Sequence, residues 1–371
     1  MSNSKLDKLI KEADKLYGEG TIMRASEYPE LPRLSTGILG LDMIFGGGLP
    51  KGRLVIYAGN ESTAKTASSL HSIAEAQRTC RICMSPMEDG VCPKCGEDGA
   101  PHKAVFIDIE GTFDPVWANN IGVDLDELLL SQPDYSEEAV DLTEALIRTG
   151  EVDMLVVDSI AMMTPTEEIE KSSEKNIMGT HAKLNNRMFR SVQAGMNSLG
   201  MKNTRKPVII VINQFRQDIG TNFGDPTTMP GGKGQKFSAS IIAKFYATSS
   251  NIIYETGKDK KAVGQRVRAK TAKNKTYPPH KEGYFDLYTD DTAEYGMKKG
   301  QIDNTQALVD AADNLEMIEK AGSWYTYSCE VGEVKAQGAT NLTKELRANE
   351  EVKDYLKEKI LKTVYDKDTD F

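Results

Sequence analysis

The chain has 371 residues, of which 39% are hydrophobic and 27% are charged, and its net charge at neutral pH is −9. This composition is typical of a globular protein, and no apolar run reaches the roughly 18 residues that favour a membrane span. The negative charge argues against a protein that coats nucleic acid through its overall charge, although locally basic loops could still bind it. The length favours one large domain with small appendages.

The N-terminal segment, residues 1–33, is charged and amphipathic, which is untypical of a signal peptide. Its apolar side chains recur at the spacing of one helix face, at Leu6, Leu9, Ile10, Ala13, Leu16 and Tyr17. We therefore expect a helix over 4–17 and then a linker that contains glycines and prolines. The pattern leaves open whether this short helix docks on its own core or on a neighbouring subunit. We assign residues 1–33 as an oligomerisation helix and linker.

The strongest motif follows a buried strand that we expect over Leu54–Ala58. Gly59 opens a loop, and Lys65 and Thr66 begin a helix predicted over 65–78. This order of strand, loop and helix is that of a P-loop, which binds phosphates through backbone N–H groups and a helix N-terminus. In such a loop the lysine reaches the β- and γ-phosphates, and the hydroxyl residue binds Mg²⁺. The sequence therefore predicts a nucleotide site.

One position departs from the usual P-loop, because Ala64 stands where the motif has its second glycine. A left-handed backbone at this position would strain alanine, whereas a helical backbone would make the change harmless. We expect the triphosphate at Gly59, Asn60, Glu61, Ser62, Thr63, Ala64, Lys65 and Thr66.

Four of the five cysteines lie in one short segment, at Cys80, Cys83, Cys92 and Cys95. They form two Cys-x-x-Cys pairs, and this spacing is typical of a structural zinc site with four thiolate ligands. Disulfides or unused thiols are the alternatives, but the absence of a secretory signal implies a reducing compartment. Residues 79–103 interrupt the connection between the P-loop helix and the next strand, so we interpret them as a zinc-knuckle insertion. His102 lies outside the two pairs, and Cys329 is isolated.

Three further apolar runs predict buried strands, over Ala104–Ile109, Met154–Val157 and Val208–Ile212. Because strands alternate with helices, we expect a parallel α/β sheet with its chemistry at the carboxyl ends of the strands. Asp158 would hold Mg²⁺ there, and Glu110 would polarise the attacking water. Each of these carboxylates could instead cap the helix that follows it. Gln214 lies between a strand and a glycine-rich segment, where it could couple the γ-phosphate to a loop.

Two segments lack a regular period, and long segments of this kind are usually functional. Residues 166–178 are polar with mixed charge, and residues 215–236 are rich in glycine. Residues 307–371 return to a charged helical pattern with an acidic end, which indicates a small C-terminal domain and tail. The core is therefore assigned to residues 34–306.

Short blocks spread over almost the whole chain form a second pattern. In chain order they include Thr21–Arg24, Leu34–Gly37, Asp108–Glu110, Leu129–Asp134, Asn213–Arg216, Gly231–Gly232, Lys273–Lys275 and Lys320–Tyr325. Together they resemble the bacterial RecA-type homologous recombinases, apart from the knuckle. The resemblance implies an α/β fold: a RecA-like P-loop ATPase core with an N-terminal helix and a small α/β C-terminal domain. The related RadA branch-migration proteins do carry a four-cysteine motif, but there it precedes the ATPase domain.

The resemblance implies roles for the site residues. Glu110 would be the catalytic base, and Gln214 would couple ATP to the second DNA-binding loop. Lys65 would hold the triphosphate, with Thr66 and Asp158 at the magnesium ion. The resemblance places Trp117 and Tyr288 at the adenine, with the tryptophan in place of the usual tyrosine, and includes Asp114 among the ATP-binding residues. The ATP of the adjacent subunit would be reached by Lys236, Lys273 and Lys275, although a solvated loop is the alternative for the last two.

Single-stranded DNA would lie along the axis of a filament, bound by the segments 166–178 and 215–236. Met178 corresponds to an apolar wedge between bases. The other residues that the resemblance places at the DNA are Gly179, Lys183, Arg190, Arg216, Gly231 and Gly232. Backbone contacts of this kind bind DNA without reading its sequence.

These observations predict a cytoplasmic, DNA-dependent ATPase that exchanges DNA strands in homologous recombination and repair. The expected cofactors are ATP, Mg²⁺ and Zn²⁺. The expected partners are single- and double-stranded DNA, further copies of the chain in a helical filament, and a recombination loader or single-strand-binding protein; no membrane is expected. Two alternatives are a DNA motor of the RadA or helicase type and an ATP-binding scaffold with weak hydrolysis.

Overall fold

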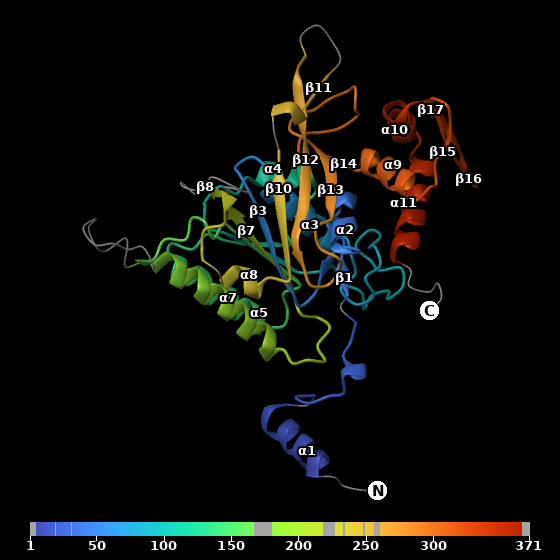
Figure 1. The fold of residues 1–371 in the computed structure, drawn as a ribbon. Helices are drawn as coiled ribbons and strands as arrows, with labels where there is room; N and C mark the ends of the chain where they lie inside the picture. The colour runs from blue at the N-terminus through green and yellow to red at the C-terminus, as the bar shows by residue number, and fades with distance from the viewer. Residues whose placement is uncertain are drawn as a thin grey trace.

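The computed structural model describes residues 5–18, 20–30, 32–166, 180–217, 227–232, 234–247, 249–255 and 260–365. The chain forms a large central sheet flanked by helices (Figure 1), so the predicted α/β fold is confirmed. In spatial order the sheet contains β14 (Ile302–Asp303), β13 (Glu282–Tyr288), β12 (Ala262–Asn274), β10 (Ile241–Tyr246), β3 (Leu54–Gly59), β7 (Val208–Gln214), β6 (Met154–Asp158), β4 (Ala104–Asp108) and β5 (Leu128–Ser131). A further strand, β11 (Ile252–Tyr254), pairs with β12.

The strands from β10 to β5 are parallel to their neighbours, whereas β12, β13 and β14 pair antiparallel. The predicted strands in the parallel part are all present. Their register aligns Gly59 with Gln214 and Asp108 with Asp158. Polar residues of three strands, Asp108, Asp158 and Gln214, therefore lie at the same edge of the sheet as Gly59.

Two hydrophobic clusters bury the two faces of this sheet. Strand β3 shows why, because its side chains alternate: Val55 and Tyr57 enter one cluster, while Leu54, Ile56 and Ala58 enter the other. A strand buried on both faces reads as a continuous apolar run. The first face is covered by α2 (Leu39–Phe45), α3 (Lys65–Gln77) and α4 (Pro115–Ile121), and the second by α5 (Ser136–Arg148) and α7 (Thr180–Ser198).

The N-terminal helix α1 (Lys5–Tyr17) confirms the predicted amphipathic helix but does not pack into the core clusters (Figure 1). Ala13 is buried, whereas Leu16 and Tyr17 are 73% and 78% exposed. A short 3₁₀ turn (Ala25–Glu27) and a pair of two-residue strands, β1 (Arg33–Leu34) and β2 (Leu49–Pro50), lead into the core. The apolar face of α1 is thus uncovered within the described chain.

The C-terminal segment forms a small unit with its own hydrophobic cluster. It contains α9 (Thr305–Asn314), the antiparallel strands β15 (Glu319–Ala321), β16 (Trp324–Cys329) and β17 (Gly332–Gln337), and the helices α10 (Ala339–Ala348) and α11 (Glu350–Tyr365). The acidic end of the chain, residues 366–371, lies outside the described residues. Among the helices that are described, none combines the length and apolar character that crossing a bilayer requires.

The remaining described elements are short. They are α8 (Gly234–Ser238), the paired strands β8 (Arg216–Gln217) and β9 (Thr227–Thr228), and a 3₁₀ turn (Ser249–Asn251). The cysteine segment 79–103 lies between α3 and β4, as expected for an insertion on that connection.

Candidate functional site

The P-loop joins the carboxyl end of β3 to the start of α3. Gly59 leaves no room for a side chain, because an added Cβ would lie 2.6 Å from Thr63 Oγ1 and 2.7 Å from Phe245 O. Lys65 begins α3 and is 6% exposed. Its Nζ donates to the carbonyl oxygen of Asn60 at 2.6 Å, so the ammonium lies within the loop. Burial lowers the pKa of Lys65, while the nearby Asp158 and Glu110 oppose that shift. This is the place for a lysine that meets a polyphosphate.

Ala64 adopts the left-handed conformation, with φ 64° and ψ 22°, immediately before α3. Of the two possibilities open at the sequence level, the structure therefore shows the strained one. An L-residue in this region costs about 1–2 kcal/mol relative to the right-handed helix.

Replacing Ala64 with glycine is expected to raise the free energy of unfolding by about 0.5–1 kcal/mol, because glycine adopts positive φ without strain. Denaturant-induced unfolding of the two proteins would measure the difference. Ala67 lies inside α3, so its replacement with glycine should instead lower stability by about 1 kcal/mol. If both variants lost a similar amount of unfolding free energy, Ala64 would not be strained in the wild-type chain.

Asp158 ends β6 beside the start of α3. Its Oδ2 accepts a 2.6 Å hydrogen bond from the hydroxyl of Thr66, and the carboxyl group is 4% exposed. Burial raises its pKa to about 7, with a further increase from the charge of Glu110. A hydroxyl and a carboxylate side by side are oxygen ligands of the kind that Mg²⁺ prefers, so this pair fits a magnesium site. The hydrogen bond to Thr66 favours this role over the alternative in which Asp158 caps a helix.

Binding of Mg²⁺ is expected to weaken roughly tenfold for each unit of pH below 7, because the cation must displace a proton from Asp158. The raised pKa also affects folding stability, because the folded chain holds the proton on Asp158 more tightly than the unfolded chain does. In the metal-free protein this group therefore contributes stability at low pH, and the contribution is lost as the pH rises from about 4 to about 7. Titrating Mg²⁺ against a bound, non-hydrolysable ATP analogue between pH 5.5 and 8 would test this. Asp158→Asn should abolish the dependence, and a curve that is already flat at pH 6 would contradict it.

Glu110 follows β4 and makes two side-chain contacts at the same edge of the sheet. Its Oε1 accepts a hydrogen bond from Ser159 Oγ at 2.5 Å and another from Gln214 Nε2 at 3.1 Å. The two residues predicted as base and sensor are therefore in direct contact, and Glu110 does not cap a helix through these bonds. Ser159 was missed in the sequence, where its position directly after Asp158 was the available signal.

A second set of amides ties the end of β7 to the glycine-rich segment. Asn213 Nδ2 donates to the carbonyl oxygen of Pro230 at 3.0 Å and to Gln235 Oε1 at 2.8 Å. Gln235 Nε2 in turn donates to the carbonyl oxygens of Met229, Pro230 and Gly232. A displacement of the Asn213-Gln214 pair would therefore be transmitted to residues 229–232. Neither Asn213 nor Gln235 was singled out in the sequence beyond its motif.

The residues expected toward the adenine end of the ATP site differ in their exposure to solvent. Asp114 is the N-cap of α4, since its Oδ1 accepts from the backbone N–H groups of Val116 and Trp117 at 2.8 and 3.1 Å. Trp117 lies in the first turn of that helix, with Lys299 Nζ 5.6 Å from its ring centre. Tyr288 is 1% exposed and its ring packs on another tyrosine, so it offers almost no surface to a ligand in this structure. A contact between Tyr288 and adenine stays a prediction.

Three lysines lie together away from the P-loop of the same chain. Lys273 Nζ donates to the carbonyl oxygen of Lys236, and Lys275 Nζ donates to that of Phe237 at 3.4 Å. In the sheet Lys273 pairs with Ile242, which aligns with Ile56 in the middle of β3 rather than with its carboxyl end. Burial and the neighbouring Lys275 lower the pKa of Lys273.

The residues expected to bind DNA are only partly described. Lys183 and Arg190 are exposed on α7, and Arg216 is exposed at the start of β8. Gly231 and Gly232 have φ values of 99° and 76°, and an added Cβ on Gly231 would lie 2.6 Å from the side chain of Asn185 on α7. Met178, Gly179 and most of the segments 166–178 and 215–236 lie outside the described residues.

The four cysteines of the knuckle converge, with their sulfur atoms all within 4.8 Å of one another. Their residues are Cys80, Cys83, Cys92 and Cys95, all present as free thiols. The Sγ atoms of Cys83 and Cys92 are 3.4 Å apart, well beyond the ~2.05 Å of a disulfide. Four converging thiols can hold a metal ion. His102 is not one of the group, since its Nδ1 bonds to the carbonyl oxygen of Thr79 at 2.8 Å.

An ion-pair network also connects the knuckle to Lys51 and Asp153, which lie just before strands β3 and β6. Arg81, which lies between the first two cysteines, contacts Asp153 Oδ2 at 3.1 Å, and Lys51 contacts Asp153 Oδ1 at 3.1 Å. Asp153 is fully buried and Lys51 is 2% exposed. Removing one partner of such a buried pair is costly, because it leaves an uncompensated charge.

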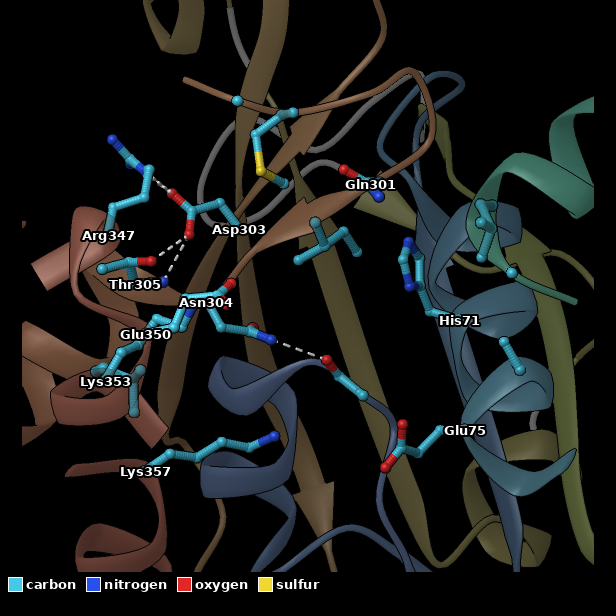
Figure 2. A pocket seen from close by; sticks show the side chains of 18 of the residues that line it. His71, Glu75, Gln301, Asp303, Asn304, Thr305, Arg347, Glu350, Lys353 and Lys357 are labelled. Atoms are coloured by element: carbon cyan, nitrogen blue, oxygen red, sulfur yellow. Dashed lines mark hydrogen bonds and ion pairs between the residues drawn. The ribbon is translucent and has the colours of Figure 1, made fainter. Parts of the chain in front are cut away.

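A cavity of about 580 Å³ lies away from this site, between the core and the C-terminal unit (Figure 2). Its walls carry charges of both signs, with His71 and Glu75 from α3 facing Lys353 and Lys357 from α11. His71 Nε2 bonds to the carbonyl oxygen of Gly300 at 2.9 Å, and burial lowers its pKa to about 4. None of the predicted catalytic residues lines this cavity, so it is not where the phosphate chemistry would take place.

Comparison with known proteins follows the same division of the chain. A family model described as the RecA N-terminal domain matches residues 4–94 and 94–293, and one described as the RecA C-terminal domain matches residues 306–365. The chain is 36% identical to Protein RecA of Macrococcus caseolyticus, over 97% of this chain and 90% of that protein. It is 36% identical to Protein RecA of Caldanaerobacter subterraneus, over 96% and 92% of the two chains. The identity to Protein RecA of Chelativorans is 37%, over 94% and 85%.

Proposed function

The chain belongs to the RecA family, and on that premise we propose that it is an ATP-dependent DNA strand-exchange recombinase. It is a DNA-dependent ATPase that acts in homologous recombination and repair as a helical homo-oligomer. The observation that best supports this function is the contact between Glu110 and Gln214. It joins the proposed catalytic base to the residue that leads into the glycine-rich segment.

Each proposed step uses groups that lie at one edge of the sheet. Backbone N–H groups of residues 59–66 and the ammonium of Lys65 bind the triphosphate. Thr66 and Asp158 would hold Mg²⁺, which when bound would offset charge on the phosphates. Glu110 orients the attacking water and accepts its proton, while Ser159 holds the carboxylate in position.

Gln214 couples this chemistry to DNA binding. Its hydrogen bond to Glu110 would change when a γ-phosphate arrives, and Asn213 carries that change to Pro230 and its neighbours. The DNA side is proposed to include Met178, Gly179, Lys183, Arg190, Arg216, Gly231 and Gly232. Exposed cations on α7 and glycines that allow close backbone approach suit binding without sequence preference.

A second copy of the chain would complete the ATP site. Lys236, Lys273 and Lys275 lie away from their own P-loop, as expected for residues that reach the nucleotide of an adjacent subunit. The uncovered apolar face of α1 would dock on that neighbour. A head-to-tail contact of this kind, repeated without closure, produces a helical filament. We further propose a cytoplasmic location and contact with a loader or single-strand-binding protein.

We also propose that the knuckle cysteines bind one Zn²⁺ ion. Four cysteine ligands in two Cys-x-x-Cys pairs favour zinc over the harder cations that prefer oxygen. The ion would fix the fold of a segment that has few regular elements of its own.

The experiment that tests the function is ATP turnover of the wild-type chain with and without single-stranded DNA, followed by a strand-exchange assay. Strong stimulation together with joint-molecule formation is the expected result. Stimulation together with duplex unwinding that needs no homology would instead favour a DNA motor. Bound ATP with negligible turnover would favour a binding scaffold.

A further inference from the structure

A small polar cavity of about 90 Å³ lies at the opposite end of β3 from the P-loop, beside the segment that leads to α1. Arg53 immediately precedes β3 and Lys206 lies in the loop before β7, and both line this cavity. The backbone N–H of Gly52 donates to the carbonyl oxygen of Pro207 at 3.0 Å, which fixes the two cationic residues next to each other. Six residues of β3 separate the cavity from the phosphate loop, or roughly 20 Å of strand.

Neither cation forms an ion pair with a described residue. Within the described chain, the Nε atom of Arg53 is buried without a hydrogen-bond partner. Burial and the positive charge of Arg53 both lower the pKa of Lys206. Lys51 also lines the cavity, but its charge is already matched by Asp153. Both side chains are partly buried, and like charges held together in partial shelter from water are unfavourable unless an anion joins them.

The remaining walls supply neutral hydrogen-bonding groups. They include the side chains of Asn197, Asn203 and Thr204, while the carboxylate that lines the cavity within the described chain, Glu30, is exposed. Glu30 forms no ion pair with either cation among the described contacts. The cavity has about the volume of three water molecules, which suits one small anion and is too small for a nucleotide. A guanidinium and an ammonium with amide and hydroxyl donors are the groups that bind phosphate.

We propose that this cavity, the Arg53–Lys206 pocket, is a second phosphate-binding site, separate from the P-loop. Its ligand is a single tetrahedral oxyanion, either inorganic phosphate or one phosphate group of a nucleic acid backbone. The proposal does not depend on ATP hydrolysis or strand exchange, since the pocket shares no residue with the proposed catalytic site.

Equilibrium dialysis with radiolabelled inorganic phosphate tests the proposal, with the P-loop first filled by a non-hydrolysable ATP analogue and Mg²⁺. The wild-type chain should bind one phosphate per chain under these conditions. Lys206→Gln should weaken that binding roughly tenfold or more, since a charged hydrogen bond is lost. Glu30→Gln should preserve or strengthen it. Lys94→Gln, which removes the same charge from the exposed knuckle surface, should leave it unchanged.

Two outcomes would overturn the proposal: no phosphate uptake once the P-loop is filled, or equal uptake by wild type and Lys206→Gln. Arg53→Gln provides a second variant, and thermal unfolding in the absence of phosphate would establish that both variants are folded. A short DNA duplex added to the dialysis identifies the source of the phosphate. If a backbone phosphate is the ligand, the duplex displaces the labelled ion and Lys206→Gln lowers the salt dependence of duplex binding by about one unit. If the free ion is the ligand, the duplex leaves the label bound.

Discussion

Replacing Glu110 with glutamine is expected to lower DNA-stimulated ATP turnover by roughly 10²- to 10⁴-fold, the usual contribution of a positioned general base. Glutamine keeps the size of the side chain and can still bond to Ser159, but it cannot accept a proton from water. ATP affinity should change little, because the substitution leaves in place the groups proposed to bind the triphosphate, namely the Lys65 ammonium and the loop backbone. Steady-state turnover and the binding of a fluorescent ATP analogue would measure the two quantities separately.

The neighbours of Glu110 supply the controls. Ser159→Ala removes a hydrogen bond to the carboxylate but leaves the base, so its effect on turnover should be far smaller. Gln214→Ala should uncouple turnover from DNA, with basal hydrolysis retained and stimulation lost. If Glu110→Gln retained full turnover, the base would have to be another group. If it lost ATP affinity as strongly as turnover, Glu110 would be a structural residue of the loop.

Much of the catalytic site could be predicted because its residues end strands with an unambiguous apolar pattern. The run from Leu54 to Gly59 is apolar on both faces of the strand, so its direction and the position of the following loop were clear. Parallel neighbours place their carboxyl ends together. This topological argument brought Glu110 and Asp158 to one edge without any knowledge of their contacts.

The contacts themselves depend on register, which local sequence does not encode. The bond between Glu110 and Gln214 joins residues 104 positions apart, and that between Thr66 and Asp158 joins residues 92 positions apart. The local sequence pattern also does not determine the backbone conformation of Ala64, because strained and relaxed conformations are distinguished only by how the loop turns. The burial of Tyr288 follows from packing against Tyr295, a residue in an irregular loop with no periodic signal.

The knuckle gives a second example of a contact that local sequence does not encode. Cysteine spacing predicted its metal site, but nothing in the spacing indicated that Arg81 reaches the buried Asp153 at the start of β6. The sequence describes only an insertion on the connection between α3 and β4, with no contact to the core. The ion pair instead links its fold to the stability of the core.

Removing the metal with a chelator is expected to unfold the knuckle and also to lower the stability of the core by up to about 3 kcal/mol. Arg81 lies between two of the proposed ligands, Cys80 and Cys83, so unfolding of the knuckle would take it away from Asp153 and leave a buried, partly uncompensated charge. Lys51 remains beside Asp153, so the loss should stay at the lower end of the range for a broken buried pair. Metal content per chain, thermal unfolding and ATP affinity should be measured on the same samples.

ATP affinity should survive, because the knuckle follows the C-terminal end of α3 whereas the P-loop lies at the N-terminal end of that helix. Arg81→Gln should reproduce the loss of core stability while keeping one metal ion per chain, which separates the ion pair from metal binding itself. Cys329→Ser, a cysteine outside the cluster, should change neither quantity. If chelation released the metal without lowering the unfolding midpoint of the core, Arg81 would not transmit the fold of the knuckle. If it abolished ATP binding, the connection would extend along α3 to the phosphate loop, and the knuckle would be a part of the nucleotide site.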